Sequence, residues 1–321
     1  MKKLAIRLGT AIVSLYLCSV TVSAAEELIP IGQVIGLELY NDTVTVVAFD
    51  DHCAAAREAG LQIGDEILSI DGQSIDCAED VRRTLNRSDG SVDLVVQRSG
   101  EELALHLSPE ISPEGPRLGV YLRQGITGIG TVTYYDPQTG HFGTLGHGVN
   151  DSTGALLSMT RGNAYPASVV SVQRGKAGTP GLLKGALRSS QLLGTLSINC
   201  SRGVFGKAPD AWEGDALPCA EYSEIHTGAA TIRSTVGEGA PQDYSVEILK
   251  IYPKSRGDCR NFVLKVTDPA LLQTTGGIVQ GMSGSPIIQD GKLVGAVTHV
   301  LVNQPDTGYG IYIENMLDAA G

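Results

Sequence analysis

Short runs of apolar and β-branched residues, separated by glycine turns, dominate the chain. "VTVVAF" (44–49) alternates like a strand, and "SVDLVVQRSGEELALHL" (91–107) predicts a hairpin about Ser99-Gly100. Two alanine-rich or amphipathic stretches, "CAAAREAG" (53–60) and "DCAEDVRRTLNR" (76–87), predict short helices. Residues 31–107 therefore predict a small module of mixed strands and helices.

The remainder of the chain contains almost nothing but strand-like runs. "SPEISPEGPR" (108–117) has three prolines and no helical or strand period, so we interpret it as a linker. Residues 118–321 contain runs such as "GIGTVTYY", "YSVEILKIY" and "NFVLKVT" at turn-punctuated spacing. This pattern predicts a barrel or sandwich, and hence a mainly β protein of two domains.

Charge and the N-terminus limit the possible partners. The formal net charge of −11 and the scattered basic residues argue against a nucleic-acid partner. Residues 1–25 begin with three basic residues, continue as an apolar run and end in the small residues Val22-Ser23-Ala24, which is typical of a signal peptide. An uncleaved membrane anchor remains the alternative, and either one implies export.

Cysteine usage does not suggest a metal site. Five cysteines follow Cys18, with no Cys-x-x-Cys pair, and the chain contains no His-Glu-x-x-His. We expect no metal and no other cofactor, and we assign no disulfide bond.

The first module resembles a bacterial PDZ domain through "AREAGLQIGDEILSIDGQSI" (56–75), which matches both turns and both strands of that domain's core. PDZ domains add an extended peptide to a sheet edge and receive its carboxylate in a glycine-containing loop. The resemblance implies that Ile35, Gly36 and Leu37 form this loop and that the helix at 77–85 lines the groove. A spacer with an unused groove is the alternative.

The stretch "GMSGSPIIQDGKLVGAVTH" (281–299) has the features of a turn that carries a nucleophile. Glycines on both sides of Ser283 allow a sharp turn, and Asp290-Gly291 predicts a type I′ hairpin. A serine that attacks an amide needs a base within reach and two N–H groups for the oxyanion. We predict that Gly281 and Ser283 supply these N–H groups.

This segment and the later strand "GYGIYI" (308–313) are similar to the nucleophile region of chymotrypsin-like serine peptidases. With "GTLGHGVND", "KVTDPALL" and the preceding PDZ-like module, the whole chain resembles the stage IV sporulation protein B family of endospore formers. The resemblance implies a chymotrypsin-like double β-barrel over 118–321.

Six histidines are available as the base: His52, His106, His141, His147, His226 and His299. The family resemblance carries the general base onto His147, in "GTLGHGV". Of the others, His299 lies on the strand returning from the serine, where a role in the cleft wall or the core is more usual.

The resemblance carries the third catalytic group onto Asp268, in "KVTDPALL". Its alternative is a helix cap for the segment that follows it. Asp210, Asp215, Asp243 and Asp258 remain possible substitutes.

The resemblance also implies a function. The expected activity is a serine endopeptidase that works through an acyl-enzyme and cleaves a membrane-bound regulator of an intramembrane metalloprotease, which activates sigma-factor processing. The expected location is the space between the forespore and mother-cell membranes. The alternative is a PDZ adaptor whose protease-like domain is catalytically silent.

Overall fold

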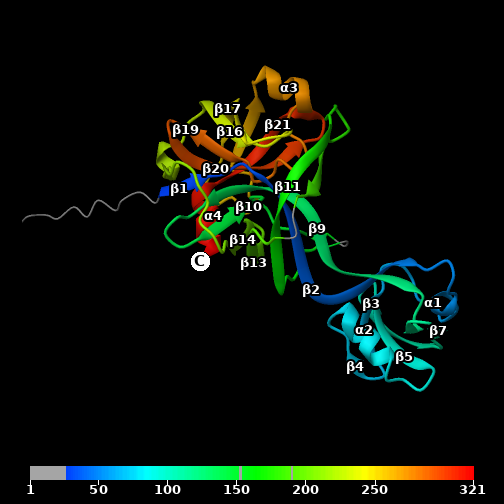
Figure 1. Cartoon of the computed structure of the whole chain (residues 1–321). Helices are drawn as coiled ribbons and strands as arrows, with labels where there is room; N and C mark the ends of the chain where they lie inside the picture. Colours follow the sequence, from blue (N-terminus) through cyan, green and yellow to red (C-terminus); the bar gives the residue numbers. More distant parts are fainter. Residues whose placement is uncertain (1–26, 152–153, 189–190) are drawn as a thin grey trace, which may run out of the picture.

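The computed structural model describes residues 27–151, 154–188 and 191–321. Strands dominate, and they form two β-barrels from which a smaller module extends (Figure 1). The predicted mainly β fold with a double barrel is confirmed. Within the described ranges, no helix is both long and apolar enough to cross a bilayer. The predicted signal segment at 1–25 lies outside the described residues.

The N-terminal barrel is a ring in which each strand pairs with the next, antiparallel, and the last returns to the first. Its strands, in order around the ring, are β2 (Val34–Phe49), β9 (Val120–Tyr135), β10 (His141–Thr144), β14 (Gly203–Lys207), β13 (Gly194–Cys200) and β11 (Arg161–Gln173). Leu37, Val132 and Leu196 fill its core, as expected when one face of each strand points inward.

The C-terminal barrel is closed in the same way. Its strands, in order around the ring, are β16 (Gly228–Ser234), β17 (Gln242–Ile251), β18 (Phe262–Val266), β21 (Gln304–Tyr312), β20 (Lys292–Leu301) and β19 (Pro286–Gln289). Between β19 and β20, Asp290 and Gly291 both have positive φ, at 50° and 75°, which confirms the predicted hairpin turn.

The smaller module has its own core, which includes Val44, Ile67, Val81 and Leu94. It contains helices α1 (Ala55–Glu58) and α2 (Ala78–Leu85), and strands β3 (Glu66–Ile70), β4 (Gln73–Ser74), β5 (Val92–Arg98) and β6 (Glu101–Leu107). The paired strands β2 and β9 run from the barrel into the module and connect the two (Figure 1). The module is therefore inserted between two barrel strands.

This insertion corrects the predicted domain boundaries. The first part of β2, up to Leu39, pairs with β11 and β9 and belongs to the barrel, although the sequence placed it in the 31–107 module. Residues 108–117 are not a linker, because they form the hairpin of β7 (Glu110–Ser112) and β8 (Gly115–Arg117). Arg117 pairs with Asp50 at 3.1 Å and fixes this hairpin to the module.

The remaining elements cover the barrels or join them. β1 (Glu27–Pro30) pairs with β9 and with β15 (Leu217–Pro218), and β12 (Leu182–Leu187) pairs with β11. A 3₁₀ turn spans Tyr222–Glu224, α3 (Pro269–Thr275) precedes the predicted nucleophile, and α4 (Ile313–Ala320) ends the chain. Met316 of α4 belongs to the same buried apolar cluster as Tyr134 of the first barrel and Ile311 of the second, so this cluster spans both barrels.

Candidate active site

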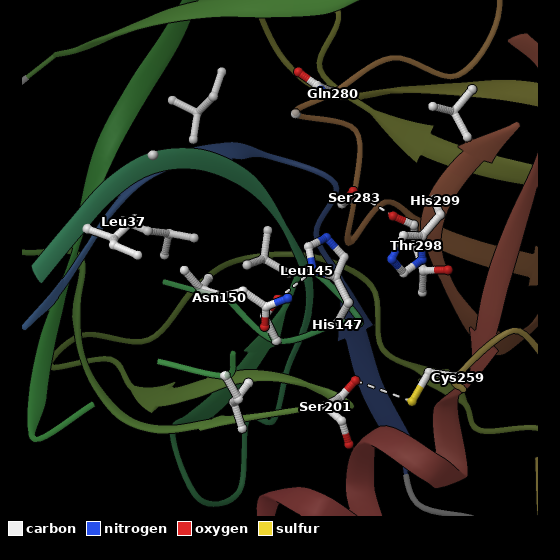
Figure 2. Close-up of a pocket in the computed structure, with 18 of the residues that line it drawn as sticks. Leu37, Leu145, His147, Asn150, Ser201, Cys259, Gln280, Ser283, Thr298 and His299 are labelled. Atoms are coloured by element: carbon white, nitrogen blue, oxygen red, sulfur yellow. Dashed lines mark hydrogen bonds between the residues drawn. The ribbon is translucent and has the colours of Figure 1, made fainter. Parts of the chain in front are cut away.

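A cleft of about 1080 Å³ lies between the two barrels. His147 and Ser201 line it from the first barrel, and Ser283, Thr298 and His299 line it from the second (Figure 2). Much of its remaining wall is apolar. The structure thus brings two of the three predicted catalytic residues, Ser283 and His147, to one cleft.

Ser283 lies on a tight turn, the serine turn (residues 281–285), between α3 and β19. Gly281 and Gly284 have φ values of 99° and 96°, where side chains with a Cβ are strained. A Cβ at position 284 would lie 2.0 Å from the carbonyl oxygen of Thr131, a backbone atom. Glycine at 284 is therefore required by the close approach of strand β9.

The serine turn leaves two N–H groups available for an oxyanion. The carbonyl oxygen of Met282, in the peptide that carries the Ser283 N–H, accepts from the Ser285 N–H at 3.0 Å. The carbonyl oxygen of Gln280, in the peptide that carries the Gly281 N–H, accepts from the Leu183 N–H at 2.9 Å. Neither the Gly281 nor the Ser283 N–H donates a backbone hydrogen bond to another described residue. Fixed donors that remain unpaired are what oxyanion stabilisation requires.

The Ser283 hydroxyl donates a hydrogen bond to the carbonyl oxygen of Thr298, at 2.7 Å. Thr298 lies on β20, the strand that returns from the hairpin after the serine turn. In this arrangement the proton of the nucleophile is directed to the main chain.

His147 lies on the segment after β10, here called the histidine loop (residues 145–150). Leu145 and Gly146 both have a φ of 68°, so the chain turns sharply before the histidine. The side chain of Asn199 holds the loop from β13, because it accepts from the Val149 N–H and donates to the Val149 and Leu157 carbonyls, each at 2.9 Å. The imidazole points toward Ser283 (Figure 2).

The environment of His147 suits a general base. Its Nδ1 donates to the carbonyl oxygen of Gly148 at 2.9 Å, which leaves Nε2 as the acceptor for a serine proton. Burial lowers the pKa of His147 below its usual 6.5, and the bond to Gly148 opposes this only in part. The ring is therefore neutral, and able to accept a proton, at neutral pH.

Asp268 does not reach this cleft. It is the N-cap of α3, where its Oδ1 accepts from the Ala270 and Leu271 N–H groups at 2.9 and 3.0 Å. The role of helix cap, which the sequence left open, is the one that the structure displays. The described residues show no contact between Asp268 and His147, and the Nδ1 of His147 donates to the Gly148 carbonyl instead.

Among the four possible substitutes, Asp258 is the one that lines the cleft. Its carboxylate binds Arg256 at 2.6 and 2.8 Å, and this pairing holds the pKa of Asp258 at about 2. Asp258 remains charged, but its partner is an arginine rather than His147.

Comparison with known proteins adds the family. The family model described as SpoIVB peptidase S55 matches residues 114–317, well over half of the chain, and a PDZ domain model matches residues 45–98. The chain belongs to the SpoIVB peptidase S55 family. The smaller module is a PDZ domain, as the sequence predicted.

Other likenesses are partial. The chain is 37% identical over 98 residues to Atu1380, a protein of Agrobacterium fabrum described as a zinc metalloprotease. The matched region is 30% of this chain and 25% of that protein. A similar protein of Rhizobium meliloti, R01501, is 33% identical over 110 residues, which is 34% of this chain and 28% of that protein. The chain thus spans under a third of the length of these curated relatives.

Two solved structures are similar at low identity. The active form of the Rv3671c protease from Mycobacterium tuberculosis has a TM-score of 0.34 at 15% identity, covering 62% of this chain and 75% of that chain. The PDZ domain of an SdrC-like protein from Listeria monocytogenes has a TM-score of 0.23 at 20% identity, covering 25% of this chain and 87% of that chain.

His299 is a second histidine in the cleft of this S55 peptidase. Its ring centroid lies 5.0 Å from that of His147. Burial, and secondly the neighbouring His147, lowers the pKa of His299 to about 4. His299 lies in the cleft wall, which is one of the two roles expected from the sequence. The sequence did not indicate that the two imidazoles would be neighbours, because their separation depends on how the barrels pack.

The other histidines lie elsewhere. His141 is exposed on β10, while His226 binds the Asp290 carboxylate at 2.8 Å. His106 binds Asp93 within the PDZ domain.

The predicted PDZ carboxylate loop is wrong. Ile35, Gly36 and Leu37 lie in β2 and pair with β11 on one side and β9 on the other, so their backbone groups are already used within the barrel. Their apolar side chains fit this role, because Ile35 and Leu37 are buried in the barrel core. The glycine between two aliphatic residues resembled a binding loop but serves as a strand.

The segment around Gly119 has the position expected of a PDZ carboxylate loop, directly before an open strand edge. Gly119, with a φ of 77°, precedes the part of β9 (120–124) that pairs with β2 on one edge. The described residues show no strand on its other edge, and the Gln124 side chain joins this stretch to Asp76, beside α2, at 2.8 Å. "LGV" (118–120) has a glycine between two aliphatic residues, as "IGL" (35–37) does, so the local sequence does not distinguish the two segments.

Proposed function

We propose that this S55 peptidase is an exported signalling endopeptidase that cleaves a membrane-bound regulator of an intramembrane metalloprotease and so starts sigma-factor processing during sporulation. The observation that carries the proposal is the cleft in which Ser283, His147 and two unpaired N–H groups meet, in a chain of this family. The likeness of the whole chain to the stage IV sporulation protein B family supports the substrate class and the location between the forespore and mother-cell membranes.

The residues of the cleft support an acyl-enzyme mechanism. The Ser283 hydroxyl rotates from the Thr298 carbonyl toward His147, which accepts its proton while the oxygen attacks the substrate carbonyl. The Gly281 and Ser283 N–H groups stabilise the oxyanion. His147 then returns the proton to the leaving amine, and water hydrolyses the ester.

The PDZ domain supports recognition of a protein partner. We place the partner's extended strand at the open edge of β9 between Val120 and Gln124, beside α2, in place of the rejected loop at 35–37. Main-chain hydrogen bonds at this edge can form with peptides of many sequences. The domain would therefore recruit the regulator, while the cleft selects the cleavage site.

The proposal is tested in a spore-forming host that lacks its own S55 peptidase. Wild type and the Ser171→Ala control, which removes an exposed hydroxyl on β11, are expected to cleave the regulator and restore sigma-factor processing. Ser283→Ala is expected to accumulate to the same level and leave the regulator intact. Full processing by Ser283→Ala would overturn the proposal in favour of the adaptor.

A further inference from the structure

Thr131 lies where the two barrels meet, on β9, and its side chain is fully buried. Its polar groups bind the residues on both sides of the cleft. The Thr131 N–H donates to the Ser283 carbonyl at 3.0 Å, and its hydroxyl donates to the Gly281 carbonyl at 2.8 Å. A single residue of the first barrel thus binds the serine turn of the second barrel twice.

The same residue also binds the start of the histidine loop. The Thr131 carbonyl oxygen accepts from the Thr144 hydroxyl at 2.6 Å and from the Leu145 N–H at 3.3 Å. Thr144 ends the strand before this loop, and Leu145 is the loop's first residue. The two halves of the catalytic site therefore share one anchor.

The hydroxyl is the part of this anchor that depends on residue type, since any residue could make the backbone bonds. Gly281 lacks a side chain and has a φ of 99°, so its own sterics restrict the peptide orientation only weakly. The Thr131 hydroxyl holds the Gly281 carbonyl, and the Met282 N–H of the same peptide donates to the Val279 carbonyl at 3.1 Å. This peptide lies between the Gly281 and Ser283 N–H groups, so its rotation would change how the two donors are oriented relative to each other.

Thr133, two residues further along β9, provides a matched comparison. Its side chain is equally buried, and its hydroxyl donates to the Gly284 carbonyl at 2.7 Å. Gly284 follows the nucleophile, and its carbonyl belongs to the last peptide of the serine turn, between Gly284 and Ser285. Loss of either hydroxyl removes one hydrogen bond to a carbonyl of the serine turn, but only the Gly281 carbonyl lies between the two oxyanion donors.

We propose that Thr131 is a positioning residue, whose hydroxyl fixes Gly281 so that the oxyanion donors face the substrate while its backbone keeps the histidine loop in register. The inference rests on the serine peptidase activity proposed for Ser283 and His147. It adds a residue that touches neither the substrate nor the reacting atoms.

The test compares Thr131→Val, Thr131→Ser and Thr133→Val in the full chain. Active sites are titrated with a fluorophosphonate, kcat and KM are measured with a peptide ester, and inhibition is measured with a peptide boronate, whose tetrahedral adduct occupies the oxyanion site. Because a small misplacement near the reacting atoms can cost about a hundredfold, Thr131→Val is expected to lower kcat per titrated site by roughly ten- to a hundredfold. KM should stay near wild type, the boronate Ki should rise by a similar factor, and Thr131→Ser should restore both.

Thr133→Val is expected to lower the melting temperature to a similar extent without the change in kcat. Equal kcat and Ki for Thr131→Val and Thr133→Val, in an active wild type, would overturn the role of Thr131 alone. No turnover or labelling of the wild type would instead count against the peptidase site itself. If the valine variants unfold, the same contrast between Thr131→Ala and Thr133→Ala below their melting temperatures decides the question.

Discussion

The Ser283 hydroxyl donates to the Thr298 carbonyl oxygen at 2.7 Å, so the nucleophile rests against the main chain of β20 rather than against His147. Transfer of this proton to His147, which lines the same cleft, requires the hydroxyl to leave the Thr298 carbonyl.

Gly284 and Gly291 form a matched pair for the geometry of the serine turn. Both have positive φ, but a Cβ at 284 would meet the Thr131 carbonyl oxygen at 2.0 Å, whereas a Cβ at 291 has open space. Gly284→Ala is expected to cost more than about 2 kcal/mol in unfolding free energy and to abolish turnover. Gly291→Ala should cost about 1 kcal/mol and keep kcat/KM. Denaturant unfolding and ester hydrolysis check both, and an active Gly284→Ala variant would contradict the close approach of β9.

Asp268 is expected to act on stability rather than on catalysis. Asp268→Ala loses two hydrogen bonds at the start of α3, which should cost about 0.5–2 kcal/mol in unfolding free energy. Asp268→Asn can still cap the helix and should keep kcat near wild type. Thermal unfolding and steady-state kinetics separate these effects. A loss of kcat of about 10⁴-fold in Asp268→Asn would show instead that Asp268 orients the imidazole.

The pH dependence of kcat/KM reports the protonation of His147 in the free enzyme. Burial disfavours the imidazolium and lowers its pKa, so the neutral base persists to lower pH than in a free imidazole. The acidic limb of the profile is therefore expected to have its midpoint below pH 6.5. A midpoint at or above 6.5 would show that His147 is more exposed, or paired with a carboxylate, during catalysis.

His299 predicts a separate effect on stability. Its pKa is about 4 in the folded protein and near 6.5 when unfolded, so the unfolded chain binds more protons between these values. Stability contributed by this group is present above pH 6.5 and is lost as the pH falls toward 4. His299→Gln should flatten the fall in melting temperature over this range, while His141→Gln, at an exposed site, should not. Parallel wild-type and His299→Gln curves would contradict this role.

The sequence predicted local structure better than contacts between distant segments. The hairpin at Asp290-Gly291 follows from turn chemistry and is confirmed. The strand at 308–313, expected from the resemblance to serine peptidases, is confirmed as far as Tyr312. The loop at Ile35–Leu37 was wrong because a glycine between aliphatic residues fits both a binding loop and a buried strand, and only the long-range pairing with β11 decides between them.

The same limit applies to the site. Ser283 and His147 carry recognisable local motifs, and the fold places both at one cleft. Thr131 and Asn199 carry none, because their roles depend on which carbonyls two other segments present to them. Asp268 had a motif that fits a helix cap as well as a catalytic acid, and sequence alone could not choose.

The most direct test of the account is the site and rate of fluorophosphonate labelling, measured by mass spectrometry on the wild type, Ser283→Ala and His147→Ala. The account predicts one adduct, on Ser283, that is absent in Ser283→Ala and forms far more slowly in His147→Ala. An adduct on another residue, or labelling of Ser283 at an unchanged rate without His147, would contradict it.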